Sequence, residues 1–304
     1  MSDSFTSPLF ILAAPRSFTS LISAMLGQHP QTYGVPELSL FMGETLRDVT
    51  ETVPGIRQQR AHGILRMVAQ VYFGEQSLLS LESAKRWVFK RSHMSVGEVY
   101  IELCRQVAPK MIVDKSPRYP SKPEYLQRIH ETFPGAYYIH LTRHPRTQGK
   151  SIMNIAGGLM AILLDSIDKS IDPPVIDPQY LWYTIQRNSL DFLSRIPVAH
   201  QRHYRGEDIL ANPQGYFEEI CRWLNLDWNE AALEAMLRPQ DSPYACIGPY
   251  GAPYGNDPNF LRSSAFTQRK TVSSSVLEGP LPWRPDGQGF IPDVIELAQK
   301  LGYE

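Results

Sequence analysis

Hydroxyl and guanidinium side chains follow the first apolar segment of the sequence at once. Residues 8–14 have the composition of a buried strand, and a Pro-Arg-Ser tripeptide ends that segment before a helical pattern begins. A strand that turns sharply into a helix directs several backbone N–H groups and the positive end of the helix dipole towards one point. Arg16 adds a fixed charge, and Ser17, Thr19 and Ser20 add hydroxyl donors. This pattern predicts a phosphate or sulfate site, and the alternative is an ordinary helix start with a capping serine.

A second anion-binding segment is predicted after a later strand. Arg143 directly follows the apolar segment Ala136–Thr142, at the strand end where open α/β sheets bind ligands. Pro145 suits the first turn of the helix that comes next. Ser151 is two helical turns further on and could face the same anion. The alternative interpretation is a helix start with solvated arginines.

Composition and charge narrow the class of protein. The 304 residues suffice for a sizeable core, and a net charge of −1 gives no bulk attraction for nucleic acid or an anionic membrane. The three cysteines, Cys104, Cys221 and Cys246, lack metal-ligand spacing, which suits a reducing compartment. Neither a signal peptide nor a run of 18 apolar residues is found. We therefore expect a soluble, cytoplasmic protein with no nucleic-acid or membrane partner.

Short apolar segments alternate with helical ones along the chain, which is typical of an α/β fold with a mostly parallel central sheet flanked by helices. We expect one domain that spans residues 1–304. The expected strands are Leu9–Ala14, Trp87–Lys90, Met111–Asp114, Ala136–Thr142 and Val198–Tyr204. The expected helices are Thr19–Gln28, Ile56–Phe73, Val96–Gln106, Lys122–Glu131, Pro145–Ala156, Tyr180–Ser194, Gln214–Leu224 and Ile291–Leu301.

Two less regular segments are expected to cover an acceptor site. Residues 157–178 start with apolar residues and end in proline and aspartate, and residues 242–270 begin with a stretch dense in Pro, Gly and Tyr. Loops of this length are usually functional or disordered. Aromatic residues in or beside the second segment favour an ordered cover. They are Tyr244, Tyr250, Tyr254, Phe260, Phe266 and Trp283.

Together, the Pro-Arg-Ser segment and the later Arg-x-Pro-Arg…Ser segment resemble the sulfotransferases that use 3′-phosphoadenylyl sulfate (PAPS). The resemblance implies a fold similar to P-loop kinases. It also implies that the first loop holds the 5′-phosphate and the sulfonate, and that the second holds the 3′-phosphate. In this sequence the first role falls on Arg16, Ser17, Phe18, Thr19 and Ser20, and the second on Arg143 and Ser151. Arg269 and Lys270 resemble the C-terminal Arg-Lys-Gly phosphate clamp of the family more loosely.

Further matches follow in the expected order from residue 8 to residue 261. Residues 25–30 followed by Glu37 resemble tyrosylprotein-type and bacterial sulfotransferases, and residues 206–226 resemble the late Glu-Asp-Leu segment of the family. Residues 255–261 are similar to a loop in the sulfotransferase domains of olefin-forming polyketide synthases. Two departures concern histidine. Cytosolic sulfotransferases carry a Lys-Thr-His strand end, and this chain has Pro117 at the position of that histidine. The polyketide-synthase domains use a histidine in their C-terminal part, and no histidine follows His203 here.

Sulfonate transfer to an alcohol is an in-line displacement, in which the protein aligns two oxygens and offsets negative charge. Arg16 and Lys115 both end strands of the expected sheet, so their cations can reach one point at its carboxyl edge. Lys115 could instead form a salt bridge with Asp114 or a helix carboxylate. Glu37 is the expected general base because Leu38 and Phe41 can form an apolar pocket beside it. The alternatives are a helix-terminal role for Glu37 and His93 as the base.

We therefore expect a sulfotransferase that moves the sulfonate of PAPS to a hydroxyl group and releases adenosine 3′,5′-bisphosphate (PAP). The acceptor would be a small, partly hydrophobic metabolite, free or linked to a carrier, and no metal is expected because no residue cluster has metal spacing. One alternative is an ATP-dependent kinase, although no Gly-x-x-x-x-Gly-Lys-Ser/Thr loop lies near Arg16. Another is a non-catalytic nucleotide sensor, which would not need Glu37 as a base.

Overall fold

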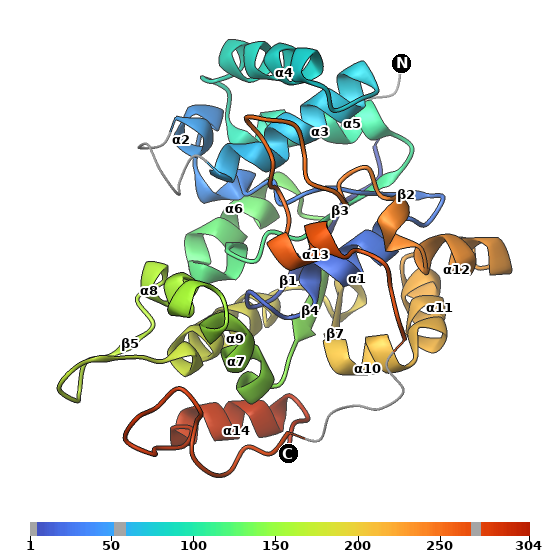
Figure 1. The fold of residues 1–304 in the computed structure, drawn as a ribbon. Coiled ribbons are helices and arrows are strands. Elements are labelled where there is room, and N and C mark those ends of the chain that lie inside the picture. The colour runs from blue at the N-terminus through green and yellow to red at the C-terminus, as the bar shows by residue number, and fades with distance from the viewer. Residues whose placement is uncertain (1–4, 52–58, 269–274) are drawn as a thin grey trace.

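The structure is a computed structural model that describes residues 5–51, 59–268 and 275–304. Within these residues, five parallel strands form a central sheet in the order β2-β3-β1-β4-β7, as Figure 1 shows. The expected α/β fold with a parallel sheet is thus confirmed. The strands are β1 (Leu9–Leu12), β2 (Thr32–Gly34), β3 (Met111–Asp114), β4 (Tyr137–Thr142) and β7 (Gln201–Arg205), and an antiparallel pair is formed by β5 (Ile167–Asp168) and β6 (Val175–Ile176).

The continuous apolar run of β1 is explained by burial on both faces of the sheet. Phe10 and Leu12 point into one core cluster, and Leu9 and Ile11 point into another. The first cluster includes residues of α3 (Ala61–Phe73), α4 (Leu78–Lys90), α5 (Val96–Val107), α6 (Pro123–Thr132) and α9 (Pro178–Leu193). The second includes residues of α1 (Thr19–Gly27), α10 (Gly206–Ala211), α11 (Pro213–Trp223) and α12 (Glu230–Met236).

The remaining helices lie around this core, with α14 (Pro292–Lys300) near the C-terminus and α13 (Pro258–Arg262) in front of the sheet in the view of Figure 1. The one that follows β4 is α7 (Pro145–Met153), which packs against α9. Near the C-terminus, α14 packs on α9 from another side. The shorter helices are α2 (Leu46–Thr50), α8 (Leu159–Leu163) and α13, with 3₁₀ turns at Leu40–Met42, Tyr119–Ser121, Ala156–Gly158, Val198–His200 and Pro239–Asp241.

The predicted strand Trp87–Lys90 is wrong, because these residues form the last turn of α4. A capping box stabilises the start of this helix, in which Ser77 and Ser80 satisfy each other's backbone N–H groups. Buried residues then recur at helical spacing up to Trp87. The prediction followed the short aromatic segment and missed the serine cap ten residues before it.

Two further differences concern strand positions. The last strand begins at Gln201, after a 3₁₀ turn at Val198–His200, so the predicted start at Val198 is too early. The edge strand β2 was not predicted. It has three residues, and Gly34 packs so closely on Gly27 of α1 that a Cβ at Gly34 would lie 2.9 Å from the Gly27 Cα. A strand this short, with a glycine, carries little apolar signal.

Candidate active site

The strands are parallel, so the loops after their carboxyl ends meet at one edge of the sheet. The first of these loops joins β1 to α1 and has two left-handed residues, Arg16 (φ 69°) and Phe18 (φ 61°). Non-glycine residues adopt this conformation only at an energetic cost, and such strain is common at functional sites. No side chain caps α1 at its start. The buried hydroxyl of Ser17 lacks a hydrogen-bond partner among the described residues. The loop therefore offers unsatisfied donors to an anion.

The first loop and the loop after β4 are in direct contact. The Arg143 side chain donates from Nη1 to the backbone oxygen of Arg16 over 2.7 Å, and its guanidinium carbon lies 4.3 Å from the ring centroid of Phe18. In turn, Arg16 donates from Nε to the Ser151 hydroxyl over 3.1 Å. Three residues expected to bind one nucleotide thus lie together, although Arg16 and Ser151 are 135 positions apart.

Two residues missed by the sequence analysis support these loops. The buried side chain of Gln148 donates to the Pro15 backbone oxygen over 2.9 Å and so ties α7 to the first loop. Gly206 starts α10, and a Cβ there would lie 2.6 Å from the Phe18 ring. Glycine is therefore required at this position. The close approach of Phe18 could not be read from the sequence.

Lys115 and Glu37 form an ion pair beside the first loop. The Lys115 ammonium follows β3, is fully buried, and also donates to the Ser20 hydroxyl over 2.9 Å. Burial lowers the pKa of Lys115, and the negative charge of Glu37 opposes this shift. Burial likewise lowers the pKa of Arg16, again opposed by Glu37. A carboxylate and two cations expected to act together therefore share one electrostatic environment.

Asp114 is held by hydroxyl groups. Lys115 pairs with Glu37, and neither Asp114 nor a helix carboxylate, the partners raised as an alternative, forms a salt bridge with it among the described residues. The Asp114 carboxylate accepts from Tyr119 over 3.1 Å and from Tyr100 over 3.2 Å. Burial raises its pKa to about 7, and these hydrogen bonds oppose that shift. Asp114 thus anchors the end of β3 to Tyr100 and Tyr119.

A loop from the C-terminal part of the chain lies over this site. We call residues 243–257 the strap. Its Gly255 oxygen accepts from the Glu37 backbone N–H over 2.6 Å. At its end, the Asp257 N–H donates to the Ser20 hydroxyl over 3.3 Å, and the Asp257 carboxylate pairs with Arg16. The helix α13 then begins, and its Phe260 packs with Ala24 of α1. This segment was expected to cover the acceptor site, whereas the contact between Asp257 and Arg16 was not predicted.

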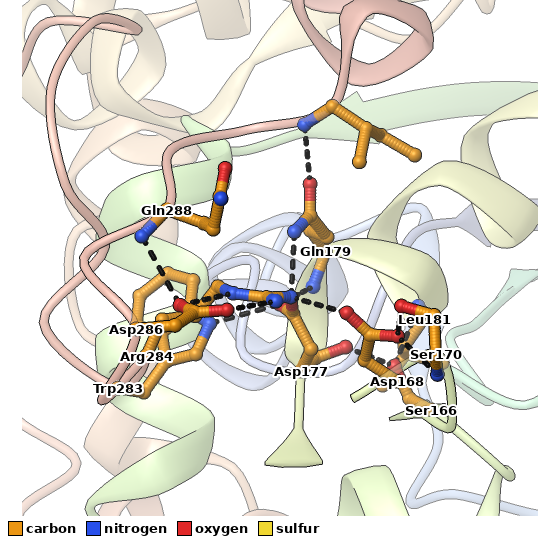
Figure 2. A network of polar contacts seen from close by, with 11 residues as sticks. Ser166, Asp168, Ser170, Asp177, Gln179, Leu181, Trp283, Arg284, Asp286 and Gln288 are labelled. Atoms are coloured by element: carbon orange, nitrogen blue, oxygen red, sulfur yellow. Dashed lines mark hydrogen bonds and ion pairs between the residues drawn. The ribbon is translucent and has the colours of Figure 1, made fainter. Parts of the chain in front are cut away.

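A buried ionic cluster secures the other expected cover segment, residues 157–178 (Figure 2). Arg284 donates from Nη1 to the Asp168 carboxylate over 2.7 Å and to the Asp177 carboxylate over 2.6 Å. Trp283 donates to Asp177 over 2.9 Å. The cluster joins the β5–β6 pair, the start of α9 and the C-terminal segment. The charged groups of this cluster bind one another, which indicates a structural role.

Three histidines, His93, His140 and His144, have their contacts away from these reacting groups. The buried His140 side chain forms a 2.6 Å hydrogen bond with Gln186, and His144 caps α7 by accepting from the Arg146 N–H over 3.1 Å. Burial lowers the pKa of His140 to about 3 and that of His144 to about 4, so both are neutral. His93 is exposed in the turn between α4 and α5.

The remaining observations concern the expected phosphate clamp, metal sites and membrane-spanning helices. Arg269 and Lys270, expected as a loose phosphate clamp, lie outside the described residues. Among the residues that are described, no three His, Cys, Asp or Glu side chains gather as a metal site. A helix with the length and apolarity to cross a membrane is likewise absent from the described part of the chain.

Comparison with known proteins identifies the chain as a sulfotransferase. The model of the sulfotransferase family matches residues 8–230, and the chain belongs to this family. The family resemblance expected from the sequence is confirmed. Members of this class are enzymes that transfer a sulfonate group. No curated protein matches the sequence significantly.

Solved structures agree with this assignment. The sulfotransferase domain from the curacin biosynthetic pathway has 24% identity and a TM-score of 0.78, with 98% of both chains covered. The sulfotransferase domain of the Synechococcus PCC 7002 olefin synthase has 25% identity and a TM-score of 0.70, over 98% of this chain and 96% of that one. Sulfotransferase STF9 from Mycobacterium avium has 15% identity and a TM-score of 0.51, over 98% and 78%.

Proposed function

We propose that this protein transfers the sulfonate of PAPS to the hydroxyl group of an acceptor. The observation that carries the proposal is the convergence of Arg16, Lys115 and Glu37 at the start of α1. The unpartnered Ser17 hydroxyl and the uncapped start of α1 fit a 5′-phosphate or sulfonate oxygen. Arg143, adjacent to this loop, is suited to the 3′-phosphate, with Ser151 beside it.

In the proposed reaction, the acceptor oxygen forms a bond to sulfur while the bond from sulfur to the bridging phosphate oxygen breaks. Lys115 and Arg16 offset the charge that develops on the leaving oxygen. Glu37 takes the hydroxyl proton, and PAP leaves with the electron pair of the broken bond. Because Lys115 pairs with Glu37 in the structure, its shift towards the leaving oxygen would release the carboxylate for this role.

The acceptor is proposed to be small and partly hydrophobic, free or carrier-linked. The strap and the 157–178 segment would cover it. A cavity of about 290 Å³ borders that segment, with Arg118, Tyr125, Leu163, Tyr180 and Leu181 among its lining residues. The likeness to two sulfotransferase domains over 98% of this chain supports one domain at residues 1–304. Its three free cysteines support the cytoplasm as the compartment.

Transfer of label from [³⁵S]PAPS to a panel of alcohols (1-octanol, 2-naphthol and 3-hydroxydecanoate) tests the proposal. We expect a sulfated product and stoichiometric PAP, with no transfer of label from [γ-³²P]ATP and magnesium. Preferred transfer from ATP would establish a kinase. Tight binding of PAP without transfer to any alcohol would favour a nucleotide sensor, and failure to bind PAP would refute the proposal.

A further inference from the structure

Arg66 of α3 is a fully buried arginine without a carboxylate partner among the described residues. Its guanidinium binds neutral oxygen atoms and, over 3.9 Å, the Cys246 sulfur. It donates from Nε to the Gln76 side chain over 2.5 Å, from Nη1 to the Tyr254 backbone oxygen over 3.2 Å, and from Nη2 to the Pro243 backbone oxygen over 3.3 Å. Burying an unpaired charge is costly unless hydrogen bonds compensate. Such an arrangement calls for a reason beyond general stability.

The two backbone oxygens are at opposite ends of the strap. Pro243 opens it, and Tyr254 directly precedes Gly255, whose own oxygen holds the Glu37 N–H. The middle of the strap folds over the same guanidinium, since a Cβ at Gly248 would lie 2.8 Å from the Arg66 Nε. A single rigid fork of donors thus fixes a loop of some fifteen residues.

The same helix also fixes Glu37 from its other side. Gly63 lies one turn before Arg66, and a Cβ there would lie 1.9 Å from the Glu37 backbone oxygen. Glu37 is therefore held between α3, through Gly63, and the strap, through Gly255. Arg66 links these two supports, because it belongs to α3 and binds the strap.

We propose that Arg66 is a positioning residue for sulfonate transfer: it locks the strap to α3 and thereby sets the backbone of Glu37 and the acceptor-side cover. This inference rests on the proposed function. It assigns Arg66 no contact with donor or acceptor. Its loss should therefore impair transfer while the nucleotide grip formed by Arg16, Arg143 and α1 remains. Asp257, the strap residue that contacts this grip, is the N-cap of α13 and stays anchored to α1 through Phe260.

The test compares Arg66→Met, which keeps the length of the side chain but removes all donors, with Arg66→Lys. Arg91→Met is the matched control, because Arg91 packs on Trp87 and pairs with Glu102 at a distance from the strap. Hydrogen–deuterium exchange measures how fast the backbone amides exchange in the peptides that contain Glu37 and in those from residues 243–257. Calorimetry reports PAP binding, and the [³⁵S]PAPS assay with the best alcohol of the panel reports kcat and KM.

For Arg66→Met we expect faster exchange in both peptides, a loss in transfer of about 10²-fold, and PAP affinity within about twofold of the wild type, because small misplacements near a reacting group suffice for such losses. Arg66→Lys should recover part of the rate, and Arg91→Met should change none of these values. Wild-type exchange and transfer in Arg66→Met would overturn the proposal, as would parallel losses of PAP binding and transfer.

A second variant acts from the strap side in case Arg66→Met does not fold. Gly248→Ala places a methyl group against both the Ala252 backbone oxygen and the Arg66 side chain, so it displaces the strap from Arg66 without altering α3. The same exchange and rate changes are expected, and their absence counts against the proposal. If the wild-type protein transfers no sulfonate, the proposed function fails on its own. Exchange at Glu37 then still decides whether Arg66 holds the strap.

Discussion

At the scale of single residues, the pairing of Lys115 with Glu37 sets the chemistry available at the sheet edge. The Lys115 ammonium is fully buried, so burial lowers its pKa, and the nearby Glu37 carboxylate opposes the shift. Asp114 adds negative charge behind it. These carboxylates favour the charged form of Lys115, which is the form that can offset a leaving phosphate oxygen.

Glu37→Gln tests the base at this scale. The amide keeps the shape of the side chain but cannot take the acceptor proton, so we expect kcat to fall by about 10²-fold or more. PAP affinity, measured by calorimetry, should stay near the wild-type value. His93→Gln is the control, because His93 is exposed outside this cluster. If His93→Gln abolishes transfer and Glu37→Gln does not, the rival base is correct.

At the scale of elements, the two segments proposed to cover the acceptor are fastened by different means. The strap is held by neutral backbone oxygens on Arg66, whereas the 157–178 segment is held by the charges around Arg284 (Figure 2). Hydrogen bonds from Ser170, and then the Arg284 guanidinium, lower the pKa of Asp168 to about 2. Asp168 thus stays ionised in the folded protein. Its contribution to the free energy of unfolding is lost only as the pH falls from the pKa of Asp168 in the unfolded chain towards 2.

Arg284→Met should destabilise the fold by about 3–5 kcal/mol, because it leaves the carboxylates of Asp168 and Asp177 buried without their cation. Urea unfolding at pH 7 measures the loss. Arg187→Ala is the matched control, since Arg187 and Asp191 form an exposed pair on α9 whose loss costs about 1 kcal/mol or less. Equal unfolding midpoints for the two variants would show that the cluster does not stabilise the segment.

At the scale of the whole molecule, the sheet places neutral histidines in its interior. His140 on β4 and His144 at the start of α7 have pKa values lowered by burial, to about 3 and about 4. Unfolding exposes both rings to water, where they bind protons below pH 6.5. The unfolded state therefore gains protons as the pH falls, and the folded state does not.

Each such histidine should therefore lower the free energy of unfolding below pH 6.5, by about 1.4 kcal/mol per pH unit. Asp114, whose pKa is raised to about 7, takes up a proton in the folded state over the same range and opposes part of this fall. Urea unfolding at pH 7, 6 and 5 measures the free energy of unfolding. In His140→Gln, whose amide can still reach Gln186, the fall between pH 6 and 5 should be smaller. His93→Gln should leave the slope unchanged. A wild-type slope in His140→Gln would contradict the assignment.

The sequence alone indicated which polar segments lie at the carboxyl edge of the sheet, and these are the segments proposed to carry the chemistry. Buried strands on both faces of a parallel sheet read as continuous apolar runs, and polar residues directly after them mark its carboxyl edge. Arg16, Lys115 and Arg143 were found in this way. The prediction of a strand at Trp87–Lys90 was wrong because three apolar or aromatic residues and a lysine do not reveal their period without the distant cap at Ser77.

Only the tertiary structure decided which of these segments meet. The pairing of Glu37 with Lys115, the contact of Asp257 with Arg16, and the hold of Arg66 on the strap join residues far apart in the chain. No local pattern marks them, because a side chain's partner across the fold depends on how helices and loops pack. Gly206 is one example, since its need for glycine comes only from the Phe18 ring. Local propensity fixes the elements, and packing fixes the site.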